Sequence, residues 1–281
     1  MLKRADLLGD IAAVAKALPP FPTIVLQLLD MLHDENSSLE VVGRLARNDP
    51  VISGNILAIA NHVRRLRAQS DLSDPYAAAS LIGVNHVRRI VVNAGMNRLL
   101  GGKGSSFFFS HSFAVAVASQ ELAALCGVSP DEAYIAGILH DVGQLCFHMI
   151  ADQAFQDAYQ QSAVDGKLIE RETALFGMDH CQIGAKLAHY WNLPEEVLSA
   201  IETHHDEATV TSRLQAVVCL GETLARALDI PASTRNRVVS LNSKAVEFLE
   251  IDWSSPEMLD CFGRCRARFQ HGAKHFASQP V

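Results

Sequence analysis

Histidines gather in one part of this sequence, several of them beside acidic residues. Seven of the twelve histidines lie between residues 111 and 205. The doublet His140-Asp141 ends the apolar run AYIAGILHD, and His204-His205 ends PEEVLSAIETHH. Imidazole nitrogens together with carboxylate oxygens suit zinc, iron, manganese or nickel. His140-Asp141 is therefore either part of a metal site or a buried polar pair with ordinary hydrogen-bond partners.

The helical context of these histidines favours a metal site. His111 begins HSFAVAVASQELAAL and His180 begins HCQIGAKLAHYW, whereas the two doublets end their segments. Side chains from several helix ends can converge on one cavity. A single helical histidine is more often an ordinary packed residue with one hydrogen bond, so the prediction rests on the whole set. Cys181 follows His180, but adjacency in sequence is not catalytic geometry, and no cysteine has a context that marks it as activated.

The elements that must position these residues are all predicted to be helices. Apolar residues recur at three- and four-residue spacing, and alternating β-branched runs between tight turns are missing. The spacing predicts helices over residues 111–126, 130–148, 173–190, 194–205 and 212–229, with two more at the C-terminus. It also predicts four earlier helices: TIVLQLLDML, LEVVGRLARN, VISGNILAIANHV and PYAAASLIGVNHVRRIVVNAGMNRLL, the last turning near Gly83.

A glycine- and serine-rich stretch divides the helices into two groups. GGKGSS, at residues 101–106, follows one helical array and precedes the histidine-rich one. Its glycines lack the spacing and the preceding strand of a phosphate-binding loop. We therefore predict an all-α protein with an N-terminal helical bundle over residues 1–104, packed on a helical core over residues 105–281.

Charge and composition limit the classes of partner. The net charge of −7 argues against nonspecific nucleic-acid binding. Residues 1–104 nevertheless carry 12 basic and 9 acidic side chains, and Arg64, Arg65 and Arg67 are either a solvated helix face or a contact for an acidic partner. Neither a membrane-spanning apolar stretch nor a signal peptide is visible, so we expect a cytoplasmic protein. The six cysteines form no CxxC pair and are expected to be reduced.

Together, these motifs resemble a known family. His111, the doublet in GILHDVGQL, and His180 followed by YWNLPEEVLSAIETHH are similar to the HD superfamily of metal-dependent phosphohydrolases. The stretches LPPFPTIVLQLLDML, RNDPVISGNILAIAN and AASLIGVNHVRRIVVNAG, and AVEFLEIDWSSPEMLDCFGRC near the C-terminus, narrow the resemblance to HDOD, the HD-related output domain. It covers nearly the whole chain and implies an HD-like helical core over residues 105–281.

The resemblance implies a bacterial signal-transduction output module that regulates other signalling proteins or binds a small ligand. It also implies a partly retained metal site for one or two divalent ions. The last aspartate of the HD pattern aligns with Glu222, which offers the same oxygen ligand one methylene further out. The implied ligands are His111, His140, Asp141, His180, His204, His205 and Glu222.

The alternative is a metal-dependent phosphohydrolase or phosphodiesterase, in which a metal-bound water attacks a phosphoester. Two departures from the catalytic pattern weigh against an enzyme. Gln144 replaces the lysine that often follows the His-Asp doublet, so a cation for a substrate phosphate is missing there. HHDEATVTS also lacks the Gly-Tyr-Pro motif of the related cyclic-di-GMP phosphodiesterases. The sequence leaves open which metal binds, which partner is regulated and whether the chain forms a homodimer.

Overall fold

The computed structural model describes residues 50–277, except residues 100–105, 192, 207, 234–235 and 237–239. All regular elements in these ranges are helical and none is a strand, which confirms the predicted all-α class. The described residues fall into two compact units, residues 50–99 and residues 106–277. The predicted boundary between residues 104 and 105 lies outside the described residues, as do the helices predicted over residues 23–32 and 39–48.

The first unit contains α4 (Pro50–Leu66), α5 (Pro75–Ile82) and α6 (Val84–Leu99). Among the described residues, α4 begins at Pro50. Ile52, Ile56 and Ala60 repeat at four-residue spacing and are buried. Between α5 and α6 stands Gly83, with a φ of 84°. This positive φ, which glycine adopts without strain, explains why the long predicted segment turns there.

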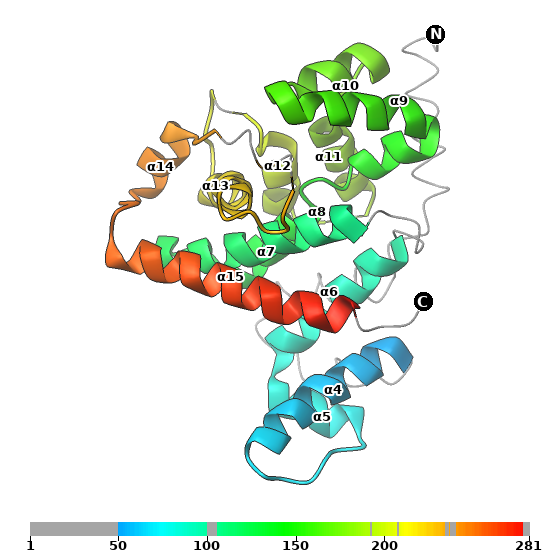
Figure 1. Cartoon of the computed structure of the whole chain (residues 1–281), viewed down its shortest axis with the longest axis vertical. Helices are drawn as coiled ribbons and strands as arrows, with labels where there is room; N and C mark the ends of the chain where they lie inside the picture. The colour runs from blue at the N-terminus through cyan, green and yellow to red at the C-terminus, as the bar shows by residue number, and fades with distance from the viewer. Residues whose placement is uncertain are drawn as a thin grey trace. The chain divides into compact units, whose positions relative to one another are not determined.

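The second unit contains nine described helices (Figure 1). They are α7 (Ser106–Cys126), α8 (Pro130–Leu139), α9 (Gln144–Asp165), α10 (Leu168–Phe176), α11 (His180–Tyr190), α12 (Glu195–Thr203), α13 (Arg213–Ala227), α14 (Ser243–Leu249) and α15 (Pro256–Ala277). None of the described helices in either unit is long and apolar enough to cross a membrane.

Helix α7 is the centre of this unit and contacts α8, α13 and α15. Small residues permit the close contacts. A Cβ on Gly137 of α8 would lie 2.9 Å from the Cα of Ala116 in α7, and one on Gly221 of α13 would lie 2.2 Å from the Ser119 hydroxyl. The backbones of α8 and α13 therefore approach α7 closely, and this brings their functional side chains near those of α7.

Two predicted helices are in fact each broken in two, and both breaks matter for the site. The segment predicted as one helix over residues 130–148 ends at Leu139 and restarts at Gln144. The segment predicted over residues 173–190 ends at Phe176, and a new helix starts at His180. Gly177 adopts a left-handed φ of 77° and closes the first part. Hydrophobic spacing continues across both breaks, which is why periodicity missed them.

Candidate metal centre

Four imidazoles surround one buried carboxylate in the second unit. The Nε2 atom of His180 lies 3.1 Å from Oδ1 of Asp141, and that of His140 lies 3.3 Å from Oδ2. The Nε2 atoms of His111 and His204 lie 3.7 and 3.8 Å from the same carboxylate. All five side chains are buried. Residues up to 93 positions apart in sequence thus meet around Asp141.

Each of the four imidazoles comes from a different helix or helix end. His140 caps the C-terminus of α8, His180 is the first residue of α11, and His204 caps the C-terminus of α12. His111 was predicted to begin its helix but lies inside α7, which starts at Ser106. Phe108 and Phe109 extend the helix upstream, because their burial packs another turn against the core.

The turn that carries His140 and Asp141 is held close to the start of α11. A Cβ on Gly143 would lie 2.0 Å from the carbonyl oxygen of His180 and 2.7 Å from the amide nitrogen of Gly184. Only a glycine permits this approach. Gly143 therefore allows the carboxylate of Asp141 to reach the imidazole of His180.

Three of the imidazoles have their Nδ1 atoms already engaged. Nδ1 of His140 donates to the carbonyl oxygen of Gly137 at 2.8 Å, and Nδ1 of His204 donates to that of Ile201 at 2.7 Å. Nδ1 of His180 donates to the carboxylate of Glu172 at 2.6 Å. Since a carbonyl oxygen only accepts, the proton of each neutral ring lies on Nδ1, and Nε2 presents its lone pair to the cluster. Metal-binding histidines are usually oriented in this way.

Three inward-facing atoms of the cluster make no hydrogen bond, although the two nitrogens among them lie 3.1–3.3 Å from the Asp141 carboxylate. Nε2 of His140, Nε2 of His180 and Oδ1 of Asp141 are fully buried and make no hydrogen bond. Burying such polar atoms without a partner is costly, and most buried polar groups avoid it. A cation coordinated by these atoms would satisfy all three. The residues therefore fit the divalent metal that the sequence predicts.

Without a metal, the side chains of the cluster shift one another's pKa values. Burial raises the pKa of Asp141, but the neighbouring His140 and His180 hold it well below its usual range. Burial lowers the pKa of His204, yet Cys181 and Asp141 raise it to about 10. A proton on His204 thus offsets part of the negative charge. A divalent cation can take the place of this proton, which makes metal binding compete with protonation.

The two remaining predicted ligands lie at the edge of the same cluster. Nδ1 of His205 lies 3.6 Å from Oε2 of Glu222, on α13. Donor atoms of His140, His204 and Glu222 all lie within 4.8 Å of one another. The structure therefore brings every predicted site residue into one region of the second unit. Glu222 also pairs with the guanidinium of Arg226, one helical turn away, and this pairing holds its carboxylate in place.

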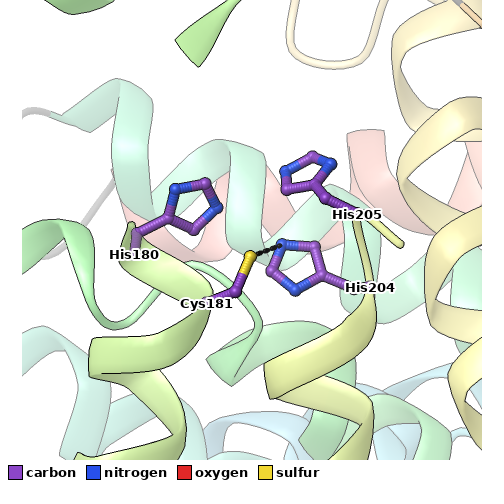
Figure 2. A group of neighbouring side chains, drawn as sticks. All are labelled: His180, Cys181, His204 and His205. Carbon is purple, nitrogen blue, oxygen red and sulfur yellow. Dashed lines mark hydrogen bonds between the residues drawn. The ribbon is translucent and has the colours of Figure 1, made fainter. Parts of the chain in front are cut away.

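A cysteine that the sequence analysis set aside also belongs to this region. Donor atoms of His180, Cys181, His204 and His205 lie within 4.8 Å of one another. Figure 2 shows these four side chains grouped together, with the sulfur of Cys181 directed at the ring of His204. Burial raises the pKa of the Cys181 thiol, but His180 and His204 bring it below its ordinary value. The six cysteines are free thiols, as expected.

Sequence reasoning missed three contributors. Cys181 was dismissed because its only signal was adjacency to His180. Glu172 stands eight residues before His180, a separation that no periodicity connects, and Gly177 turns the chain between them. Arg226 could have been found, because it follows Glu222 at the four-residue spacing that pairs opposite charges on a helix.

A small cavity lies beside the cluster. Its volume is about 90 Å³, and its lining includes His111, Tyr159, His205 and Arg226. Gln144, which stands where catalytic relatives often have lysine, is only 3% exposed at the start of α9. Gln144 brings no positive charge, so the arginine in the cavity lining, Arg226, supplies the cationic side chain there. Its guanidinium already pairs with Glu222.

A comparison with protein-family models identifies the family to which this chain belongs. The model of the HDOD domain matches residues 18–207, which is more than half of the chain. The chain belongs to the HDOD family. The resemblance inferred from the sequence is thereby confirmed. All the predicted ligands except Glu222 lie within the matched HDOD residues.

Similar proteins extend this result to the fold. A Treponema pallidum protein that carries no functional name is 23% identical over 220 residues, which are 71% of this chain and 40% of that protein. The chain thus spans less than half the length of this curated relative. An HDOD protein of unknown function from Geobacter sulfurreducens has a TM-score of 0.68 at 23% identity, covering 94% of this chain and 89% of that one.

A Marinobacter aquaeolei VT8 protein, named for signal transduction, has a TM-score of 0.76 at 17% identity, covering 98% of this chain and 66% of that one. These likenesses show the fold that HDOD proteins share.

Proposed function

We propose that this HDOD chain is a signalling module that acts by binding other proteins, and that one or two divalent metal ions hold its core. His111, His140, Asp141 and Glu222 would bind one ion, and His180, His204 and His205 the other. The observation that carries the proposal is the buried set of unpartnered donor atoms around Asp141. The name of the Marinobacter aquaeolei protein, which places it in signal transduction, supports the signalling role.

A metal in this position would join helices that are distant in sequence. The donor residues come from α7, from the C-terminal ends of α8 and α12, from the start of α11 and from the second half of α13. An ion that binds the folded chain and not the unfolded one stabilises the fold by mass action. The metal would therefore maintain the shape of whatever surface the partner recognises.

The enclosure of the site favours binding over turnover. Ligand pockets commonly have volumes of about 300–1,000 Å³. The cavity beside the cluster measures only about 90 Å³, and the side chains of His140 and His180 are wholly buried. A cavity of this volume encloses at most part of a nucleotide or cyclic dinucleotide. Gln144 adds no positive charge for a phosphate.

A metal-dependent phosphohydrolase is a second candidate, favoured by the position of Arg226. Its guanidinium lines the cavity together with His111 and His205, so a cation stands beside the ligands although Gln144 supplies none. When bound, a divalent metal of this kind lowers the pKa of a coordinated water towards about 7. Arg226 would orient a small phosphomonoester, and the burial of the cluster would exclude bulk water.

Elemental analysis of protein purified without a histidine tag or chelator tests the metal centre. We expect near-stoichiometric metal in the wild type and its loss in His140→Ala. A folded wild type that binds no zinc, iron, manganese or nickel on reconstitution would refute the proposal.

The metal-loaded protein then separates the two candidates. Phosphomonoesters, nucleotides and cyclic dinucleotides are incubated with wild type and with Arg226→Gln. The signalling module predicts no hydrolysis by either protein, and predicts that an Arg226→Gln copy that keeps its metal restores the phenotype of a gene deletion. Turnover by the wild type that Arg226→Gln abolishes, together with failed complementation, would instead establish the phosphohydrolase.

A further inference from the structure

We propose that Cys181 is a metal ligand, so that the ion bound by His180, His204 and His205 has a thiolate among its donors. The inference rests on the proposed metal centre and specifies the chemistry of one half of it. Cys181 is the second residue of α11 and directly follows His180 in the sequence. It is 4% exposed, so its thiol is shielded from solvent.

The distances suit a tetrahedral ion. Zinc bonds of about 2.1 Å to nitrogen and 2.3 Å to sulfur place neighbouring donor atoms roughly 3.4–3.8 Å apart. The sulfur of Cys181 lies 3.9 Å from Nε2 of His204, and the four donor atoms of the group all lie within 4.8 Å of one another. Small movements of side chains would close them around one ion.

The second, independent observation is the imidazole of His180. Its Nε2 atom is completely buried and makes no hydrogen bond. Its Nδ1 atom and its backbone amide both donate to Glu172, at 2.6 and 2.9 Å, so the ring is held in one orientation. The ring is thus fixed with its Nε2 atom directed into the cluster, where the Asp141 carboxylate lies 3.1 Å away. In Figure 2 this ring stands beside the Cys181 sulfur, on the side of the group opposite His204 and His205.

Thiolate coordination would change which metal this position selects. On binding, the Cys181 thiol loses its proton to solvent and the sulfur donates an electron pair to the cation, with no change of oxidation state. Soft thiolate donors favour zinc, and discriminate against magnesium and manganese. The half of the site around His111 and Glu222 has nitrogen and oxygen donors only. The two positions therefore differ in metal preference.

Cobalt(II) substitution tests the proposal directly, because a cobalt–thiolate bond gives an intense charge-transfer band in the near ultraviolet that imidazole and carboxylate ligands do not give. The protein is stripped of metal, titrated with Co²⁺ and followed by absorbance. We expect this band in the wild type. It disappears in Cys181→Ser and persists in Cys146→Ser, a matched control at another buried cysteine that belongs to no candidate metal group of the described residues.

Zinc competition gives the second measurement. Cys181→Ser weakens the tighter zinc-binding step by about tenfold or more, and Cys146→Ser leaves it unchanged. Wild-type protein that binds Co²⁺ without a charge-transfer band would refute the Cys181 ligand and leave the metal centre standing. Wild-type protein that binds no Co²⁺ at all would refute both. The wild-type spectrum alone decides these outcomes, whether or not the serine variant folds.

Discussion

Two buried carboxylates in the second unit have opposite surroundings. Glu121 on α7 is 4% exposed, and Asp141 after α8 is 3% exposed. The two oxygens of Glu121 face Arg264 at 2.6 Å and Arg268 at 2.7 Å, both on α15. Asp141 instead faces imidazole nitrogens at 3.1–3.8 Å, two of which make no hydrogen bond.

The difference shows why burial of a charged residue alone does not identify a site. At Glu121 the opposite charges come from permanently cationic arginines, so the carboxylate charge is balanced by ion pairs that join α7 to α15. At Asp141 the neighbours are imidazoles, which can either bind a proton or coordinate a metal. Oε1 of Glu121 also makes no hydrogen bond, but a guanidinium already faces it at 2.7 Å, whereas the imidazole nitrogens around Asp141 can give lone pairs to an added cation. We therefore interpret Glu121 as a structural contact and Asp141 as the centre of a metal site.

Replacement of Asp141 should have the largest effect. Asp141→Asn keeps the shape of the side chain but removes the charge at the centre of the cluster. We expect metal affinity to fall by about 100-fold or more, since even residues that only orient ligands contribute about 10- to 100-fold. Elemental analysis after dialysis measures the loss. Asp152→Asn is the matched control, because Asp152 also pairs with an imidazole, that of His148 at 2.6 Å, but on the exposed surface. Equal metal content in both variants would contradict the prediction.

Removal of the metal should have the second-largest effect, a loss of thermal stability. At a free metal concentration 100 times Kd, binding stabilises a protein by about 2.7 kcal/mol. For a unit of this size, a chelator should then lower Tm by about 5–10 °C. Differential scanning calorimetry distinguishes the two carboxylates: the shift persists in Glu121→Gln and vanishes in Asp141→Asn. An identical shift in both variants would mean that the metal binds elsewhere.

Much of the fold was accessible from the sequence. Helical periodicity correctly indicated α13 and α12 to within a few residues, and Gly83 marked the turn between α5 and α6. The breaks after Leu139 and Phe176 were not visible, because apolar spacing continues through both. The turn at residues 140–143 depends on the contact of Gly143 with α11, which is a tertiary interaction.

The site was also predictable only in part, because some of its residues depend on tertiary contacts. Residue types identified the histidines and Asp141, since imidazole and carboxylate are metal donors wherever they stand. Glu172 and Cys181 depend on geometry, because their roles arise only once α10 and α11 bring them against His180 and His204. Sequence therefore indicates candidate ligands more readily than the residues that orient them.

Glu172 provides a smaller test of the same comparison. Glu172→Gln keeps an oxygen that can accept from the backbone amide of His180, but removes the negative charge beside its ring. We expect metal affinity to fall by about 10- to 100-fold, measured by competition with a chromophoric chelator. Glu170→Gln, an exposed change on the same helix, should leave affinity unchanged. Unaltered affinity in Glu172→Gln would show that the orientation of His180 does not depend on this carboxylate.

The smallest effect is expected at Glu121, the structural carboxylate of the comparison. Glu121→Gln breaks two ion pairs, but the side chains of Arg264 and Arg268 are 44% and 55% exposed and can return to solvent. The cost should therefore be about 1–2 kcal/mol in the free energy of unfolding, less than for a fully buried pair. Urea titration measures it, with metal content determined on the same samples. Because Glu121 contacts none of the proposed ligands, lost stability should accompany unchanged metal content. A joint loss would mean that α15 and the metal centre are coupled through α7, and that the two carboxylates belong to one network.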